Sequence, residues 1–294
     1  MSSPIDLHAH STASDGVLSP ADLVVRAAER GVRVLALTDH DTTDGLPAAC
    51  RSAQLRGVEL IPGVEVSATW AGRTLHIVGL GVDADNALLQ RGLTNIRSTR
   101  LQRAREIGRM LEGAGLEGAW DGVRTLAQGD VVGRAHYARL LVLRGLAADP
   151  SEAFRRYLRR GRPGYVPVQW ADLDEVVGWV HQAGGLAVLA HPLQYRYPRA
   201  FLRRMLAAFA AVGGDALEIV TGGSTAEQVS TAATYARRLG LAGSLGSDFH
   251  TLHPPWNDLG SIRPLPRGVV PIWERGSLLS QAALAVPADV NAPG

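Results

Sequence analysis

The chain alternates short, almost wholly apolar runs with longer segments in which apolar residues recur every three or four positions. Short apolar runs are typical of strands buried on both faces, and the longer period is typical of helices that cover them. This alternation predicts an α/β fold built on a mainly parallel sheet. The predicted strands are Ile5–His8, Val32–Thr38, Glu59–Val64, Thr74–Leu80, Leu186–Ala190, Ala216–Val220 and Leu241–Leu245.

Helix signals separate most of these strands. Ser19 followed by Pro20 is a helix start, because a hydroxyl caps the first turn and proline fits the first helical position. The periodic segments that follow the strands predict helices at Ser19–Gly31, Leu46–Arg56, Leu173–Ala183, Ala200–Val212 and Ala226–Leu239. These elements organise residues 1–85 and 165–276 into one discontinuous domain.

Residues 86–164 break the pattern, since they contain helical periodicity and no convincing strand. We interpret them as an inserted α-helical subdomain that includes helices at Arg134–Arg144 and Ser151–Arg160. An arginine-rich amphipathic helix precedes these two. Its arginines are expected on a solvated face that at most steers a polyanion: Arg97, Arg100, Arg103, Arg105 and Arg109. Residues 277–294 are rich in Ala, Pro and Gly and are expected to be disordered.

Composition places the chain among ordinary globular proteins, with 46% hydrophobic and 20% charged residues and a net charge of +2. A single cysteine, Cys50, excludes an intramolecular disulfide framework. No apolar run is long enough to cross a bilayer, so we expect a cytoplasmic protein with no membrane and no obligate protein partner. All 30 basic residues are arginine, which codon usage explains, although a guanidinium also binds phosphate in a bidentate manner.

Histidines and carboxylates gather where the predicted strands end. His8 and His10 are spaced i, i+2, so both imidazoles lie on one face of an extended strand and can reach one metal ion. Parallel strands bring their carboxyl ends together, which predicts a shared site for the others. The candidate metal ligands are His8, His10, Asp15, His40, Glu65, His76, His191, Asp248 and His250.

These ligand types suit Mn, Fe or Zn, and the absence of thiolates argues against a structural zinc site. Nine ligands are more than one ion can coordinate, and they suit two or three divalent ions, most readily Mn. Such ions can activate water and neutralise the charge on a phosphoryl oxygen. Asp39 and Asp41 flank His40, and we expect Asp39 to orient a ligand or cap the next helix rather than bind metal.

The motifs D-L-H-A-H-S-x-x-S-D-G, T-D-H-D, G-V-E, A-H-P and G-S-D-F-H resemble those of PHP-domain (polymerase and histidinol phosphatase) metal-dependent phosphoesterases. The resemblance implies a distorted (β/α)7 barrel with a trinuclear metal site. It implies one ion at His8, His10, Glu65 and Asp248, a second at Glu65, His76 and His191, and a third at Asp15, His40 and His250.

The insertion is similar to that of a PHP subgroup containing the 5′-to-3′ exoribonuclease RNase AM and 3′,5′-nucleoside bisphosphate phosphatases. In that subgroup the insertion covers the metal site and binds substrate phosphate. The resemblance rests on G-R-A-H-Y-A-R and R-P-G-Y-V-P, and it implies substrate-binding roles for Arg134, His136, Arg139 and Arg162. Two positions depart from the subgroup: Gly133 replaces Ser or Thr, and Leu193-Gln194 replaces Gly-Arg, with Arg196 a possible substitute.

The expected function is hydrolysis of a phosphate ester on a nucleotide or on the 5′ end of a short RNA. A metal-bound hydroxide would attack phosphorus in line, with Asp248 among the catalytic groups and His136 or a metal-bound water as proton donor. Trp70, Tyr137 and Tyr165 are candidates for stacking a base, whereas His181 and His253 have no expected role. A histidinol-phosphate type of metabolite phosphatase and a non-catalytic metal-bound binding module are the alternatives.

Overall fold

The computed structural model describes residues 3–195, 197–252, 257–275 and 278. Arg196, His253, the Pro255-Trp256 pair and nearly all of the tail at 277–294 lie outside the described residues. One sheet runs in the order β1-β2-β3-β4-β6-β7-β8, and β5 pairs with β3. The strands are β1 (Ile5–Asp6), β2 (Val34–Leu37), β3 (Glu59–Trp70), β4 (Arg73–Leu80), β5 (Ala171–Asp172), β6 (Leu186–Leu189), β7 (Ala216–Thr221) and β8 (Ala242–Gly246).

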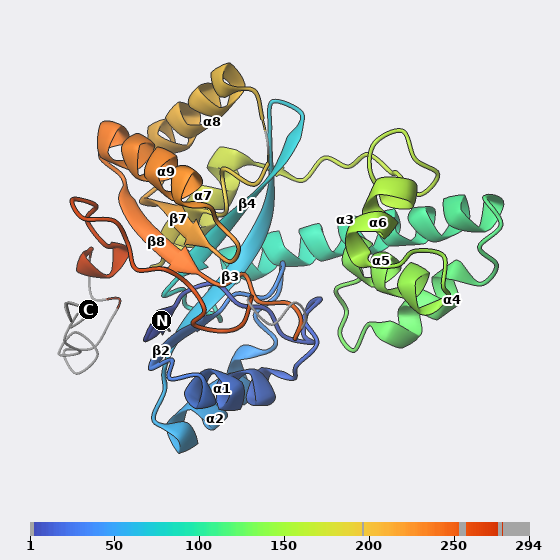
Figure 1. Ribbon diagram of the computed structural model, residues 1–294, viewed down its shortest axis with the longest axis horizontal. Helices are drawn as coiled ribbons and strands as arrows, with labels where there is room; N and C mark the ends of the chain where they lie inside the picture. The colour runs from blue at the N-terminus through green and yellow to red at the C-terminus, as the bar shows by residue number, and fades with distance from the viewer. Residues whose placement is uncertain (1–2, 196, 253–256, 276–277, 279–294) are drawn as a thin grey trace.

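The sheet curls into a nearly closed barrel, as Figure 1 shows. Its two ends meet where the Leu7 amide donates to the Leu245 carbonyl at 3.1 Å, and a parallel bridge joins Ala9 to Phe249. The expected α/β barrel is therefore confirmed. Small apolar side chains fill its interior, among them Ala36, Val188 and Ala242.

Strand β4 departs from the expected parallel arrangement. It pairs antiparallel with both β3 and β6. The cause is local, because β3 and β4 are joined by a tight turn at Ala71 and Gly72, which both have positive φ. A two-residue connection can only form a hairpin, since a parallel pair needs a long crossover. The hairpin also extends β3 six residues beyond the expected end at Val64, to Trp70.

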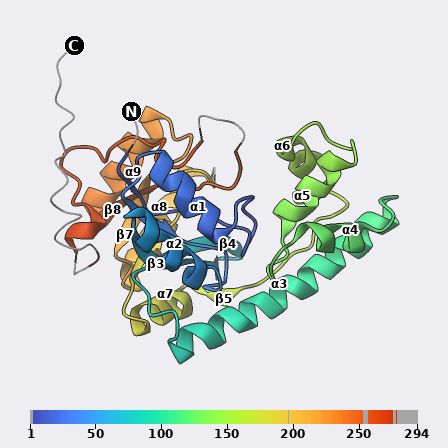
Figure 2. The same ribbon diagram turned by 90° about the horizontal axis from the view of Figure 1, so that it is seen from below.

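Helices cover the outside of the barrel (Figure 2). Helices α1 and α2 pack beside β2, and α7, α8 and α9 pack on the other part of the sheet in the largest apolar core. The described helices are α1 (Pro20–Glu29), α2 (Leu46–Arg56), α3 (Ala87–Gly113), α4 (Ala119–Leu126), α5 (Arg134–Leu143), α6 (Pro150–Ala153), the π-helix η1 (Phe154–Leu158), α7 (Leu173–Gln182), α8 (Arg199–Ala211), α9 (Ala226–Leu239) and the 3-10 helix η2 (Ile272–Glu274).

The segment from α3 to η1 projects beside the barrel mouth (Figures 1 and 2). Its apolar core is separate from the barrel cores and is built around the wholly buried Tyr137. Helix α3 belongs to both bodies, because Leu89, Leu93 and Ile96 pack in the barrel core whereas Ile107 and Leu111 pack in the insertion core. The separate core supports our proposal that residues 86–164 form an inserted subdomain. The long shared helix sets its place over the barrel mouth.

Candidate metal centre and its cavity

The nine predicted metal ligands come together at the mouth of the barrel. Glu65 lies at their centre on β3, wholly buried. Its two carboxylate oxygens face five imidazoles that follow or belong to other strands. The N–O distances are 3.4 Å to His8, 3.3 Å to His10, 2.9 Å to His40, 3.1 Å to His76 and 3.0 Å to His191.

Asp15, Asp248 and His250 complete the cluster on the side where β1 meets β8. The Asp248 carboxylate lies 3.3 Å from His10 Nε2 and 3.5 Å from His250 Nδ1. His250 Nε2 in turn lies 3.3 Å from Asp15 Oδ1, and Asp15 comes within 4.0 Å of His40. Side chains that are up to 242 positions apart in the sequence, from His8 to His250, therefore meet at this end of the barrel.

Seven of the nine predicted ligands fall into three overlapping groups that can each hold a metal ion: His8, His10 and Glu65; His40, Glu65 and His76; and His10, Asp15, His40 and His250. These groups differ from those that the resemblance implied, because His10 and His40 each belong to two of them, and His191 and Asp248 belong to none. Within the described part of the chain, five of these residues bury a ligand atom that has no hydrogen-bond partner. These atoms are His10 Nδ1, Asp15 Oδ1, His40 Nδ1, Glu65 Oε2 and His76 Nδ1. Buried polar atoms normally have partners, so clustered exceptions of the correct chemistry fit metal ions.

The charge balance of the site also suits cations. Burial opposes ionisation of Glu65, but His40, His76 and His8 together hold its pKa well below the usual value. Burial likewise opposes the ionised form of Asp248, yet neighbouring imidazoles lower its pKa. Both carboxylates are thus ionised at neutral pH, which is the form that binds metal.

Backbone strain marks the same place. His191, Asp248 and the neighbouring Asp41 have φ values of 34°, 54° and 54°. Residues other than glycine rarely adopt this left-handed region, and such strain concentrates at functional sites. Here the left-handed backbone conformation directs His191, after β6, and Asp248, after β8, into the barrel mouth.

Glu218 on β7 supports two ligands and was missed in the sequence. Its carboxylate accepts the His8 Nδ1 proton at 2.9 Å and the His191 backbone N–H at 2.6 Å. This fixes the His8 tautomer and leaves its Nε2 facing Glu65. The available signal was one carboxylate inside an otherwise apolar strand, Ala216–Thr221, in which every residue is buried.

The two aspartates that flank His40 act on neighbouring segments. Asp39 accepts hydrogen bonds from Ser11 and Ser14 at 2.6–2.7 Å and so holds the loop that carries Asp15. The expectation that it might cap the next helix is wrong, because Gly45 is the N-cap of α2. Asp41 accepts from the Ser67 N–H at 2.7 Å and pairs with Arg100.

A cavity of about 310 Å³ opens directly onto the metal ligands. Three guanidinium groups from the insertion line it: Arg100 and Arg103 on α3, and Arg134 at the start of α5. We refer to these three residues as the arginine wall. The aromatic rings of Phe154 and Trp170 also line the cavity, and neither was singled out in the sequence.

The arginine wall corrects one expectation. Arg105 and Arg109 are exposed as expected, but Arg97, Arg100 and Arg103 are at least half-buried. Arg100 pairs with Asp41 and donates to Ser67 Oγ at 2.7 Å, and Arg97 donates to the Asp41 carbonyl at 3.1 Å. The helical period alone could not show that this face of α3 turns toward the barrel, since a solvated face and a cavity face are equally polar.

The four predicted substrate-binding residues occupy different places. Arg134 lines the cavity, whereas Arg139 donates to the Asp15 carbonyl at 2.9 Å and so supports the ligand loop. His136 is buried and accepts from the Gly133 N–H at 3.2 Å, and burial lowers its pKa to about 4. Arg162 lines a separate basic pocket. Their roles in substrate binding, and those of His136 and Asp248 in catalysis, remain predictions.

The candidate stacking residues lie outside the cavity lining. Tyr137 is wholly buried in the insertion core, so it cannot stack a base. Trp70 packs edge-to-face on Phe201 with ring centroids 5.2 Å apart, and Tyr165 is half-buried. His181 pairs with Asp215 at 2.9 Å, remote from the ligand cluster.

No helix among the described residues combines the length and the apolar character needed to span a membrane.

Comparison with known proteins agrees with this geometry. The PHP domain model matches residues 6–199, so the chain belongs to the PHP family. This family membership and the clustered ligands define a metal-dependent phosphoesterase, a hydrolase. The predicted family is confirmed.

Particular relatives match over nearly their full length. A 5′-3′ exoribonuclease of Haemophilus influenzae is 45% identical over 94% of this chain and 100% of its own. A 3′,5′-nucleoside bisphosphate phosphatase of Chromobacterium violaceum is 44% identical over 97% of this chain and 99% of its own. A solved structure of an amidohydrolase from Chromobacterium violaceum, with bound sulfate and no metal, has a TM-score of 0.89 at 44% identity, covering 92% of this chain and 95% of that one.

Proposed function

We propose that this enzyme hydrolyses the ester between phosphate and the 3′ oxygen of a nucleoside that carries a 5′ phosphate. The two relatives are named a 5′-3′ exoribonuclease and a 3′,5′-nucleoside bisphosphate phosphatase, and a 5′-phosphorylated RNA end and a 3′,5′-bisphosphate share this chemical unit. In an RNA the scissile phosphate carries the next nucleotide, and in the bisphosphate it is terminal. One cavity can therefore serve both reactions.

The arginine wall is the observation that carries the proposal. Burial, the approach of Arg134 and that of Arg100 together lower the pKa of Arg103 to about 9, so it is still charged at neutral pH. Burial likewise lowers the pKa of Arg134. Arg103 donates to the Val166 carbonyl at 3.0 Å, but neither residue has a carboxylate partner within the described chain, which is unusual for half-buried charges. A bound phosphate group would supply the missing negative charge.

The cavity arrangement assigns work to particular side chains. Arg103 and Arg134 hold phosphate oxygens, while Asp41 fixes Arg100 and thereby shapes the wall. Phe154 and Trp170 offer apolar surface for a base or ribose. Divalent ions held by the carboxylate–imidazole cluster would supply activation of water and neutralisation of phosphoryl charge. Water then adds to phosphorus, the bond to the 3′ oxygen breaks, and that oxygen takes up a proton.

The products are a nucleoside 5′-phosphate together with inorganic phosphate or a shortened 5′-phosphorylated RNA. The 310 Å³ cavity and the insertion above it favour chain ends and single nucleotides over internal positions of a duplex. We further propose Mn as the ion, RNA processing as the role and the cytoplasm as the location, because the ligands are imidazoles and carboxylates and the chain has one cysteine.

Purified enzyme with Mn²⁺ tests the proposal on a 5′-phosphorylated short RNA and on 3′,5′-bisphosphoadenosine in parallel. We expect release of 5′ mononucleotides from the RNA and of phosphate from the bisphosphate. Asp248→Asn should reduce both rates by at least about 10³-fold, since it removes a ligand oxygen near His8 and His10. The exposed Asp174→Asn on α7 is the matched control and should retain full activity.

Activity on histidinol phosphate alone would overturn the proposal in favour of a metabolite phosphatase. Metal binding without turnover of any phosphoester would overturn it in favour of a binding module. Cleavage of a circular RNA would contradict the preference for chain ends.

A further inference from the structure

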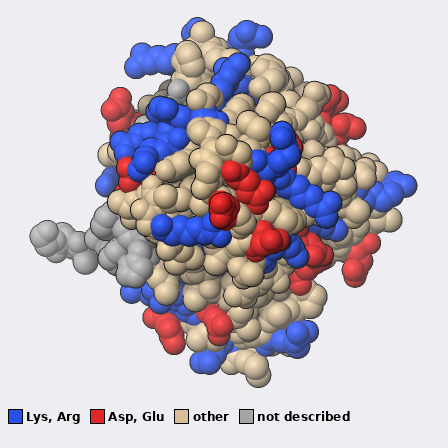
Figure 3. All heavy atoms as spheres, turned by 90° about the vertical axis from the view of Figure 1, so that its right-hand side faces the viewer, with Lys and Arg blue, Asp and Glu red and all other residues tan. Residues whose placement is uncertain are grey.

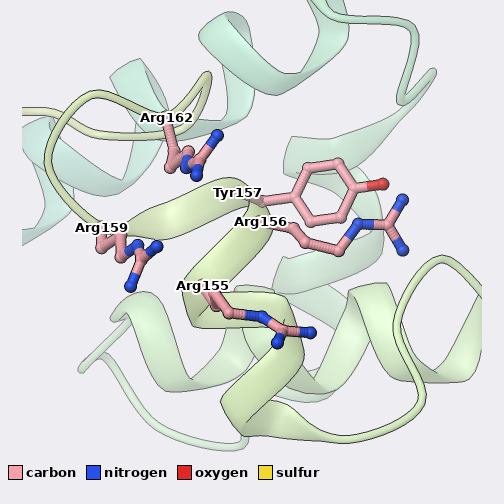
Figure 4. A pocket seen from close by; sticks show the side chains of 5 residues that line it. All are labelled: Arg155, Arg156, Tyr157, Arg159 and Arg162. Carbon is pink, nitrogen blue, oxygen red and sulfur yellow. The ribbon is translucent and has the colours of Figure 1, made fainter.

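A second basic pocket lies on the insertion, apart from the metal ligands. It has a volume of about 360 Å³ and is lined by Arg155, Arg156, Tyr157, Arg159 and Arg162. We call it the η1 basic pocket, because these residues belong to the π-helix η1 and the loop that follows it. Figure 4 shows their side chains projecting from this turn. π-Helical turns are rare and are frequently found at functional sites.

The pocket carries a large excess of positive charge. Five of the eight residues from Arg155 to Arg162 are arginine, and none is acidic. Glu152 approaches Arg155 at 3.3 Å and Arg156 at 3.6 Å, so one carboxylate serves two guanidinium groups. Arg159 and Arg162 form no ion pair with any described residue. Several exposed cations in one hollow are suited to a polyanion rather than to a single carboxylate.

The pocket is continuous in sequence with the metal-site cavity. Phe154, the first residue of η1, lines the metal-site cavity, and the next residue, Arg155, lines the basic pocket. Arg134 of the arginine wall lies over the Phe154 ring at 5.7 Å. The two hollows are thus lined by neighbouring residues of the same turn, Phe154 and Arg155.

The pocket also contains an aromatic surface. The guanidinium carbon of Arg156 lies 5.2 Å from the centre of the Tyr157 ring. Proteins that hold single-stranded nucleic acid without sequence preference combine a basic groove with aromatic rings and arginine planes on which bases stack. Figure 3, which views the molecule from the side of the insertion, shows arginine side chains gathered in several clusters on this face.

We propose that the η1 basic pocket binds backbone phosphates of single-stranded RNA on the 3′ side of the scissile phosphate. This inference rests on the proposed hydrolysis at RNA 5′ ends. No residue that lines the pocket also lines the metal-site cavity, so we expect a mononucleotide in that cavity not to touch the pocket. The pocket therefore raises the affinity for longer RNA and leaves mononucleotide hydrolysis unchanged.

The test compares two triple variants of the Mn²⁺-loaded enzyme. Arg155→Gln/Arg156→Gln/Arg159→Gln removes three charges from the pocket. Arg203→Gln/Arg204→Gln/Arg238→Gln removes three exposed charges from α8 and α9 and is the matched control. Substrates are a 5′-phosphorylated 15-nucleotide RNA, its 3-nucleotide form and 3′,5′-bisphosphoadenosine. Binding of a phosphorothioate 15-mer is measured by fluorescence anisotropy as a readout independent of hydrolysis.

The pocket variant should raise KM for the 15-mer at least about tenfold, with kcat unchanged and with normal kinetics on the bisphosphate. The slope of log affinity against log salt should become shallower by about 2, because each phosphate contact with a single strand contributes about 0.7. The control variant should change neither quantity appreciably. In the unmodified enzyme, affinity for the 15-mer should fall more steeply with salt than affinity for the 3-mer.

Equal KM shifts in the two variants would overturn the proposal, because they would show a general charge effect. An equal loss on the bisphosphate would also overturn it, by placing the pocket in the mononucleotide site. If the pocket variant has a lowered melting temperature, the salt dependence of RNA affinity in the unmodified enzyme is the deciding measurement. Equal salt slopes for the 15-mer and the 3-mer would then refute RNA binding by the pocket. If the enzyme hydrolysed the bisphosphate but not RNA, the proposed function on RNA would be contradicted. Fluorescence anisotropy would still show whether the pocket binds the phosphorothioate 15-mer.

Discussion

The ligand cluster and the arginine wall face each other across one cavity, yet they are assembled in opposite ways. Each metal ligand belongs to the barrel, in a strand or in the loop that follows one, so barrel closure alone brings the nine together. Each arginine comes from a helix of the insertion, α3 or α5, and reaches the cavity only because that insertion sits over the barrel mouth. The barrel thus provides the candidate metal ligands, and the insertion provides the arginines that line the cavity in front of them.

This difference also appears in the charge environment. Carboxylates and imidazoles in the cluster compensate each other at 2.9–3.6 Å even before an ion binds. Arg103 and Arg134 have no such compensation among the described residues. Ligands in the cluster can therefore be prearranged by the protein itself, whereas the arginine wall is complete only with an anion between it and the metal site.

Among the variants that separate the wall from the cluster, the largest effect is expected in the wall. Arg134→Gln removes a half-buried cation from the cavity lining and leaves a shorter, neutral polar side chain. We expect kcat/KM to fall about 10- to 100-fold on both RNA and bisphosphate, because a hydrogen bond to a charged group is worth about 1.5–3 kcal/mol. Metal content, measured by inductively coupled plasma mass spectrometry, should be unchanged. A loss of bound metal would show that the wall and the cluster are not independent.

A smaller effect is expected behind the cluster. Glu218→Gln keeps the shape of the side chain but removes the charge that holds the His8 Nδ1 proton. Metal affinity should fall about tenfold, at the lower end of what such supporting groups contribute, since the Gln amide oxygen can still accept one bond. Titration of the metal-depleted protein with Mn²⁺ measures this. Glu227→Gln on the exposed surface of α9 is the control, and equal affinities would refute the role of Glu218.

The smallest effect concerns the core of the insertion. Tyr137→Phe removes the hydrogen bond from the Tyr137 hydroxyl to the Ala104 carbonyl at 2.7 Å. We expect the free energy of unfolding to fall by about 1 kcal/mol in urea titrations, because the carbonyl loses its buried partner. KM for nucleotides should not change. A raised KM with normal stability would restore Tyr137 as a base-stacking residue and contradict its burial.

Periodicity and strand ends predicted much of the barrel. Helices Leu46–Arg56 and Ala226–Leu239 occur as predicted, and each ends at a glycine in the left-handed conformation, Gly57 or Gly240. The orientation of β4 was not predictable from its apolar character, since a strand buried on both faces has the same composition in either direction. The turn at Ala71-Gly72 decided it.

The sequence by itself predicted that nine imidazole and carboxylate side chains gather in one place, and the structure brings these side chains together. Histidines and carboxylates at successive strand ends must meet, because strands of one barrel share their rims. Tertiary structure alone decided which arginines line the cavity. Arg100, Arg103, Arg105 and Arg109 share one helix, yet only the first two line the cavity. The direction in which α3 leaves the barrel, fixed by packing of its apolar residues in two separate cores, makes that choice.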